Sequence, residues 1–120
     1  MILGHVRDNL PRLMVTLQGH EGPVNIEFIV DTAFEGDLAL PLSVLNRIQT
    51  TFDGDRRVRL ADGTFRRRPH FEVSIEWEGE ERLAEVVLME NEPLLGVELM
   101  EGYLLQVEIT DGGEVSLEPL

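Results

Sequence analysis

The residues best suited to chemistry are Asp31 and Thr32, within the stretch FIVDTAFEGDLALP that runs from Phe28 to Pro41. The apolar residues before Asp31 predict a strand, and Leu38–Leu40 predicts a second strand that is apolar on both faces. Strands of this kind are buried on both sides, so we expect Asp31 to lie between two interior strands. An isolated carboxylate is costly there unless it is protonated or finds a partner.

Two interpretations of Asp31 follow. Asp and Thr side chains bond nearby backbone amides, so the pair suits an ordinary surface turn. Alternatively, the carboxylate shares one proton with a second carboxylate, because two like charges about 3 Å apart cannot both ionise. The nearest cations, Arg12 and Arg47, have no obvious register with Asp31, and no second Asp-Thr pair stands in a similar apolar frame. The partner would then be Asp31 of another copy, across a twofold axis.

The elements that position Asp31 are mainly strands. Apolar residues alternate with polar ones in most of the chain, which predicts a mainly-β fold. The 120 residues predict one domain, 1–120. Short helices are predicted at PLSVLNRI and at GVELMEGY. The predicted strands are 13–17, 24–30, 38–40, 71–77, 83–89, 104–109 and 115–117.

Composition excludes several classes of protein. The formal net charge is −13, which argues against a nucleic-acid partner. No segment approaches the roughly 18 apolar residues of a membrane span, and the start lacks a signal-peptide pattern, so we expect no membrane partner and a cytoplasmic protein. The chain has no cysteine, and its three histidines are too scattered to suggest a metal site.

An arginine-rich segment needs its own explanation. Six of the ten arginines lie between Arg56 and Arg68 with one acid, Asp62. Asp62-Gly63 predicts a two-residue hairpin turn that pairs Ala61 with Thr64, Leu60 with Phe65, and Arg59 with Arg66. One interpretation is a solvated edge hairpin whose charge blocks aggregation. The other is a functional hairpin whose arginines bind an acidic substrate or pair with acids of the body, for which Glu35 and Asp37 are candidates.

FIVDTAFEGDLALP, followed by EPLLGVELMEGY, resembles the retropepsin-like aspartic proteases, and is most similar to small bacterial proteins with D-T-G-F before an apolar strand. The resemblance implies a retropepsin-like closed β-barrel with one or two short helices. It assigns Asp31 as the catalytic aspartate and Thr32 as the threonine that bonds across a dimer. Ala33 stands at the glycine position of the motif, and Gly96 follows the apolar pair Leu94-Leu95 that packs beside it.

The same resemblance assigns the arginine-rich hairpin as a flap that closes over the active-site cleft, with Leu60 and Phe65 facing the cleft. The sequence departs from the family pattern at two positions. Ala33 replaces a glycine, which is tolerable at negative φ and costly at positive φ. Val97 stands where the retroviral enzymes carry an arginine. The flap residues are Leu60, Ala61, Asp62, Gly63, Thr64 and Phe65.

The predicted function is that of an aspartic endopeptidase. A homodimer with one Asp31 per subunit would activate a water molecule to hydrolyse an extended peptide or protein substrate, without a metal or an organic cofactor. The first alternative is a non-catalytic module of the same fold that binds an acidic peptide or partner in its cleft or on its basic hairpin. The second is a structural subunit of a larger complex.

Overall fold

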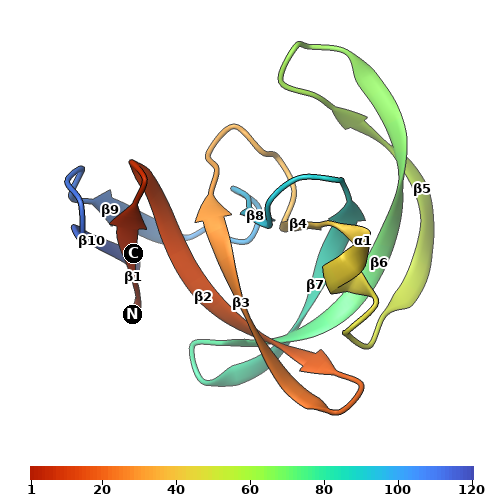
Figure 1. The fold of residues 1–120 in the computed structure, drawn as a ribbon, viewed down its shortest axis with the longest axis horizontal. Helices are drawn as coiled ribbons and strands as arrows, with labels where there is room; N and C mark the ends of the chain where they lie inside the picture. Colours follow the sequence, from red (N-terminus) through yellow and green to blue (C-terminus); the bar gives the residue numbers. More distant parts are fainter.

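The computed structural model describes residues 1–120, which form ten strands and one short helix (Figure 1). The predicted mainly-β fold is confirmed. The elements, in chain order, are β1 (Ile2–Arg7), β2 (Leu10–Gly19), β3 (Gly22–Val30), β4 (Leu38–Leu40), α1 (Leu42–Leu45), β5 (Thr51–Arg59), β6 (Phe65–Trp77), β7 (Glu80–Leu88), β8 (Leu94–Leu95), β9 (Tyr103–Val107) and β10 (Glu114–Pro119).

All seven predicted strands are present, and most extend a few residues beyond the predicted bounds. Strands β1 and β8 were not predicted, and β5 was anticipated only at its arginine-rich end. β8 cannot be predicted from the sequence pattern, because a strand of two residues is too short to show an alternation of apolar and polar residues. Its strand geometry comes entirely from the neighbours that pair with it.

One predicted helix forms and the other does not. α1 begins after Pro41, as predicted, and turns its one buried residue, Leu45, into the core. The predicted helix at GVELMEGY is wrong, because this segment makes successive turns closed by bonds between residues three apart, such as Tyr103 N to Met100 O at 3.0 Å. Buried Leu99 and Met100 fix these turns to the core, and Gly102 ends them at a φ of +85°.

The short strand β8 lies between β3 and β4. It runs parallel to β3, with Ile29 opposite Leu94 and Val30 opposite Leu95, and antiparallel to β4. The predicted packing of the Leu94-Leu95 pair beside the strand that leads to Asp31 is therefore confirmed. β8 closes the gap between the two strands that flank Asp31.

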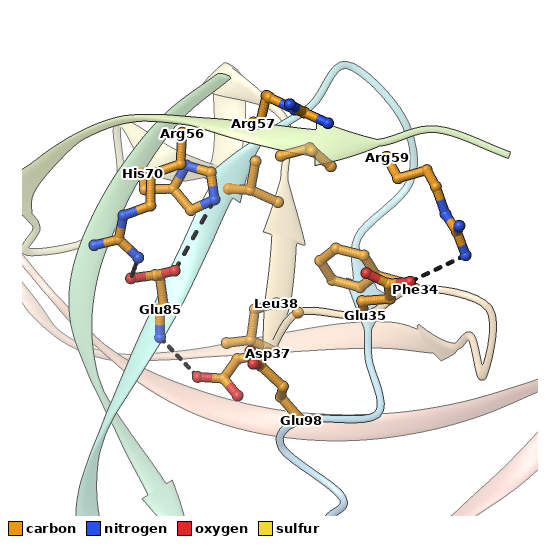
Figure 2. Close-up of a pocket in the computed structure, with 13 residues that line it drawn as sticks. Phe34, Glu35, Asp37, Leu38, Arg56, Arg57, Arg59, His70, Glu85 and Glu98 are labelled. Atoms are coloured by element: carbon orange, nitrogen blue, oxygen red, sulfur yellow. Dashed lines mark hydrogen bonds and ion pairs between the residues drawn. The ribbon is translucent and has the colours of Figure 1, made fainter. Parts of the chain in front are cut away.

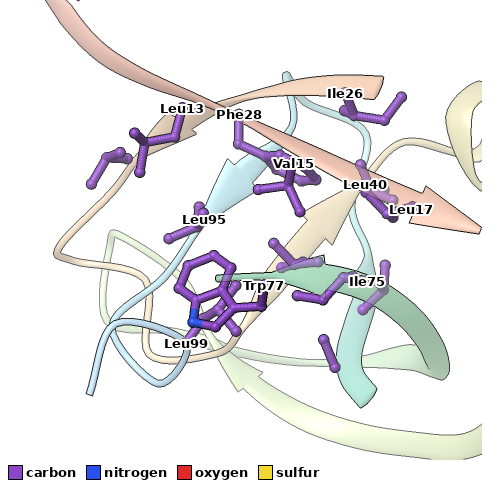
Figure 3. Packing of buried hydrophobic residues seen from close by; sticks show 14 of the residues in the cluster. Leu13, Val15, Leu17, Ile26, Phe28, Leu40, Ile75, Trp77, Leu95 and Leu99 are labelled. Atoms are coloured by element: carbon purple, nitrogen blue, oxygen red, sulfur yellow. The ribbon is translucent and has the colours of Figure 1, made fainter. Parts of the chain in front are cut away.

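The sheet folds back on itself where β2 pairs with β6 at Thr16–Glu76 and Leu17–Ile75. The pairings β2–β3–β8–β4–β7–β6–β2 then form a ring around one apolar core (Figures 1 and 3). β1, β10 and β9 extend the sheet at one end, where both termini lie (Figure 1). The core residues at its centre include Leu13, Leu17, Phe28, Ile75, Trp77, Leu95 and Leu99 (Figure 3).

The β5–β6 hairpin forms, but its predicted register is wrong by one residue. Arg59 pairs with Phe65, and Val58 pairs with Arg66. The loop has three residues instead of two, because Gly63 N bonds Leu60 O at 2.9 Å and Gly63 alone adopts a positive φ, of +84°. A two-residue turn of the Asp-Gly type needs a positive φ at both positions, and Asp62 does not have one.

Local hydrogen bonds explain this choice of loop. Asp62 Oδ1 accepts bonds from Thr64 N at 2.9 Å and from Thr64 Oγ1 at 2.6 Å. These bonds hold the pKa of Asp62 below its ordinary value and stabilise the longer loop. The shift of one residue moves each side chain of one strand to a new cross-strand partner.

The structure contains no helix with the length and apolar character needed to cross a membrane.

Leu95 and Leu94 allow a direct test of the role of β8 in the core. Leu95 is 0% exposed, whereas Leu94 is half-buried and lines a surface cleft. Leu95→Ala should lower the free energy of unfolding by about 2–5 kcal/mol, because it opens a cavity at the centre of the ring. Leu94→Ala should cost clearly less, as measured by urea unfolding at neutral pH. Equal losses would contradict the assigned position of β8.

Candidate active site

Asp31 lies immediately after β3, and its backbone is fixed to β8. Asp31 N donates to Leu95 O at 2.9 Å, and Asp31 O accepts from Phe34 N at 3.2 Å. Side-chain atom Oδ1 accepts from Ala33 N at 2.9 Å, which is the turn bond that one interpretation of the sequence predicted. β4 is buried throughout, as expected, whereas β3 is buried on one face only, and Asp31 itself is only half-buried in the single chain.

No cation of the chain pairs with Asp31. The buried guanidinium of Arg12 lies 3.6 Å from Glu27, and Arg47 makes no ion pair. The expectation that neither arginine reaches Asp31 is confirmed. Asp31 Oδ2 accepts no hydrogen bond from the chain, so one carboxylate oxygen is free to bind water, a substrate or another carboxyl group.

A cleft of about 470 Å³ separates the Asp31 loop from the β5–β6 hairpin. Seven of its twelve lining residues are hydrophobic, so the carboxylate of Asp31 stands beside apolar surface. The cleft is lined by Asp31, Ala33, Phe34, Glu35, Val58, Arg59, Leu60, Ala61, Gly63, Met89, Asn91 and Leu94.

The hairpin contributes only part of the predicted flap to this cleft. Leu60, Ala61 and Gly63 line it, whereas Asp62, Thr64 and Phe65 do not. The prediction that Phe65 faces the cleft is wrong. Its ring is 47% exposed and lies 4.0 Å from the guanidinium carbon of Arg57. In the three-residue loop Phe65 pairs with Arg59 instead of Leu60, and its ring packs against the guanidinium of Arg57.

Thr32 and Ala33 follow Asp31 at the surface. Both residues are exposed, and the hydroxyl of Thr32 makes no hydrogen bond within the chain. Ala33 is not among the residues with positive φ, so its methyl group is tolerated where the motif has glycine.

Gly96 lies behind the Asp31 loop and holds it in place. A Cβ atom on Gly96 would lie only 2.2 Å from Gly36 O, so no other residue fits without displacing the backbone. This close approach allows Gly96 N to donate to Asp37 O at 2.8 Å and Val97 N to donate to Phe34 O at 3.0 Å. Val97, which stands where the retroviral enzymes carry an arginine, is 38% exposed and supplies no charge at this position.

Charged residues gather at the base of the hairpin, around a second depression of about 200 Å³ (Figure 2). Arg56 pairs with Glu85 and Asp53, and Arg59 Nη2 lies 3.2 Å from Glu35 Oε1. The predicted role of Glu35 as a partner of the hairpin is confirmed. The same prediction for Asp37 is wrong, because Asp37 Oδ2 accepts a bond from the backbone of Glu85 at 3.0 Å.

Glu98 completes this group of acids on the side of the β8 turn (Figure 2). Loss of solvent raises the pKa of Glu98 above the ordinary value of 4.5, and the nearby charges of Asp37 and Glu85 raise it further. Ionisation of Glu98 is therefore less favourable in the folded protein than in the unfolded chain.

Sequence reasoning missed Val58, Met89 and Asn91 as lining residues of the cleft. Val58 belongs to β5, whereas Met89 and Asn91 follow β7. Nothing in their local pattern marks them, because they reach the cleft only when β7 pairs with β4 and the hairpin folds over the loop.

No group of three or more histidine or acidic side chains is placed so that it could hold a metal ion. The sequence matches no protein-family model, and it matches no curated protein.

The close contact between Gly96 and the Asp31 loop, called the Gly96 clamp from here on, can be tested with Gly96→Ala. The added methyl group should lower the free energy of unfolding by about 2–3 kcal/mol or more and speed hydrogen exchange at the amides of Val97 and Glu98. Gly79→Ala is the matched control, since Gly79 has open space around it and a φ of +79°. Gly79→Ala should lower the free energy of unfolding by about 1 kcal/mol because of backbone strain, and it should leave hydrogen exchange at the amides of Val97 and Glu98 unchanged. Equal effects of the two variants would contradict the clamp.

Glu98 predicts a pH-dependent effect on stability. Because its folded-state pKa is raised, its favourable contribution is complete below the unfolded pKa and is lost as the pH rises through the folded value. Glu98→Gln should therefore raise the urea midpoint relative to the native chain at about pH 7, and should not do so near about pH 3.5. Glu118→Gln removes the same formal charge at an exposed position of β10 and should raise the urea midpoint less. A larger increase in the urea midpoint at acidic pH than at neutral pH would contradict the assigned direction of the pKa shift of Glu98.

Proposed function

We propose that this protein is a retropepsin-like aspartic peptidase that acts as a homodimer. The finer fold assignment, a closed β-barrel of that class, belongs to the same proposal. The observation that carries it is the placement of Asp31, a carboxylate without an ion pair that lines an apolar cleft beneath a hairpin. The motif resemblance supports the assignment of the reaction.

The proposed chemistry uses one Asp31 from each subunit. Two carboxyl groups about 3 Å apart hold one proton between them, because both cannot ionise. The ionised carboxylate takes a proton from a bound water, whose oxygen attacks the carbonyl carbon of the peptide bond. The protonated carboxyl hydrogen-bonds the carbonyl oxygen. Proton transfer to the amide nitrogen then releases an amine and a carboxylic acid.

Three features of the single chain support a second subunit. Asp31 is half-buried and has an unbonded oxygen, and the exposed hydroxyl of Thr32 is also free to bond across an interface. The other acid that lines the cleft, Glu35, pairs with Arg59 and does not supply a second carboxyl group to Asp31. The dyad therefore needs a carboxyl group from elsewhere.

The cleft suits an extended peptide. Its volume of about 470 Å³ falls in the range of ligand-binding pockets, and its apolar lining can take the side chains of a few residues. An extended chain would present alternate side chains to opposite walls and could bond the backbone of the hairpin. The Gly96 clamp would hold the Asp31 loop still while the hairpin moves.

Asp31→Asn tests the proposal. It should lower peptide cleavage by about 10³-fold or more while leaving the dimer intact, because an amide cannot act as the base or share the proton. Cleavage is measured with a library of dye-quenched peptides, and the mass of the assembly by sedimentation velocity. Asp37→Asn is the matched control, since its amide oxygen still accepts the Glu85 bond and its side chain lies outside the cleft. It should keep cleavage near the native rate. Cleavage that survives Asp31→Asn would refute the assignment.

The alternative is a non-catalytic module of the same fold that binds peptides. Its specific support is the set of hairpin arginines that make no ion pair, Arg57, Arg66, Arg67 and Arg68. It predicts that the native protein cleaves no peptide in the library, and that Asp31→Asn leaves peptide binding unchanged.

A further inference from the structure

The arginine hairpin, defined as Arg56–Arg68, uses only two of its six arginines to hold itself to the body. These are Arg56 and Arg59, which pair with acids. The other four make no ion pair. Their contacts are with backbone oxygens of the hairpin, such as Arg66 Nη1 to Phe65 O at 3.2 Å, and with the ring of Phe65 in the case of Arg57.

These unpaired arginines are notable in a chain rich in acids. The hairpin carries +5, from six arginines and Asp62, which leaves −18 for the remainder of a chain whose net charge is −13. Two arginine pairs also stand directly opposite each other, Arg57 with Arg67 and Arg56 with Arg68. Like charges in such positions repel, so the folded hairpin concentrates positive charge that an anion would relieve.

The register decides which of these arginines faces the cleft. Directly opposed residues of an antiparallel pair project from the same face of the sheet. Arg66 is opposite Val58, and Val58 lines the cleft. The side chain of Arg66 therefore emerges on the same face of the hairpin as Val58, outside the residues that line the cleft, where a peptide longer than the cleft could meet it. The next residue, Arg67, projects from the outer face.

We infer that the arginine hairpin selects acidic peptides for the cleft, through contact between Arg66 and an Asp or Glu side chain of the bound peptide. This inference rests on the proposed peptide-binding function of the cleft and names its substrate class. A guanidinium binds a carboxylate through two parallel hydrogen bonds, which suits an anchor at one position of an extended chain. Residues such as Phe34 and Leu94 contact apolar side chains of the same peptide.

The acids around the cleft do not cancel this selection. Of the two acids that line the cleft, Glu35 is paired with Arg59, and Asp31 shares one proton with its counterpart in the proposed dyad. The acids at the base of the hairpin lie around the second depression. The negative charge of the body repels an acidic peptide at long range, so the recognition is short-range. Added salt should therefore speed association, in contrast to a binder with an overall basic surface.

The test measures binding in the Asp31→Asn background, where cleavage does not interfere. The probes are fluorescent apolar peptides of one sequence that carry either Glu or Gln at alternate positions. The Glu peptide should bind about tenfold more tightly than the Gln peptide. Adding Arg66→Ala should abolish this preference, whereas adding Arg67→Ala, the matched control on the outer face, should retain most of it. Fluorescence anisotropy gives the dissociation constants.

Several results would overturn the inference. Equal affinity for the Glu and Gln peptides would overturn it. Equal losses of the preference for the Glu peptide in Arg66→Ala and Arg67→Ala would also overturn it, because they would indicate that the overall charge of the hairpin is responsible. Tighter binding of a single-stranded RNA oligonucleotide through Arg66 would assign the hairpin to nucleic acid. A dimer weakened by Arg66→Ala, without a change in peptide preference, would assign it to the acidic surface of a second copy.

Failure of this inference can be told apart from failure of the proposed function. A native protein that cleaves Glu and Gln peptides equally well, with equal affinities, would retain the peptidase assignment and refute the selection. A protein that cleaves neither peptide but prefers the Glu peptide through Arg66 would refute the peptidase and support the selection.

Discussion

The placement of Asp31 depends on one constraint, the insertion of β8 between β3 and β4. This strand has only two residues, yet it pairs on both sides and accepts the backbone amide of Asp31 at Leu95 O. Gly96 then allows the chain to pass within contact of the loop that follows Asp31. The loop between β3 and β4 is thereby held mainly by backbone contacts, and Asp31 Oδ2 and the hydroxyl of Thr32 remain free of hydrogen bonds.

A loop held in this way presents its carboxylate without neutralising it. The carboxylate of Asp31 accepts a hydrogen bond only from the amide of Ala33, and no arginine of the chain pairs with it. The apolar wall of the cleft lowers the local polarity but does not fully cover Asp31. The fold leaves Asp31 half-buried with one carboxylate oxygen free, and this is the oxygen that the proposed dimer would use.

Two arginines of β5 attach the hairpin to acids of the body. Arg56 pairs with Glu85, and Arg59, next to the loop of the hairpin, pairs with Glu35. The remaining arginines of the hairpin make no ion pair. The same side chains would be unremarkable in a basic protein, but here the remainder of the chain carries a net charge of −18, from −13 for the whole chain and +5 for the hairpin.

The sequence by itself determined the strands with clear alternation, the apolar frame around Asp31 and the clustering of arginine, because these depend on local pattern and composition. It also indicated that Leu94-Leu95 packs beside β3, through the motif resemblance. Only the tertiary structure decided the rest. The bonds between Asp62 and Thr64 set the hairpin register and turned Phe65 away from the cleft, whereas β8 and the turns around Leu99 exist only because the core holds them. Such features depend on contacts between distant segments, for which a local pattern carries no signal.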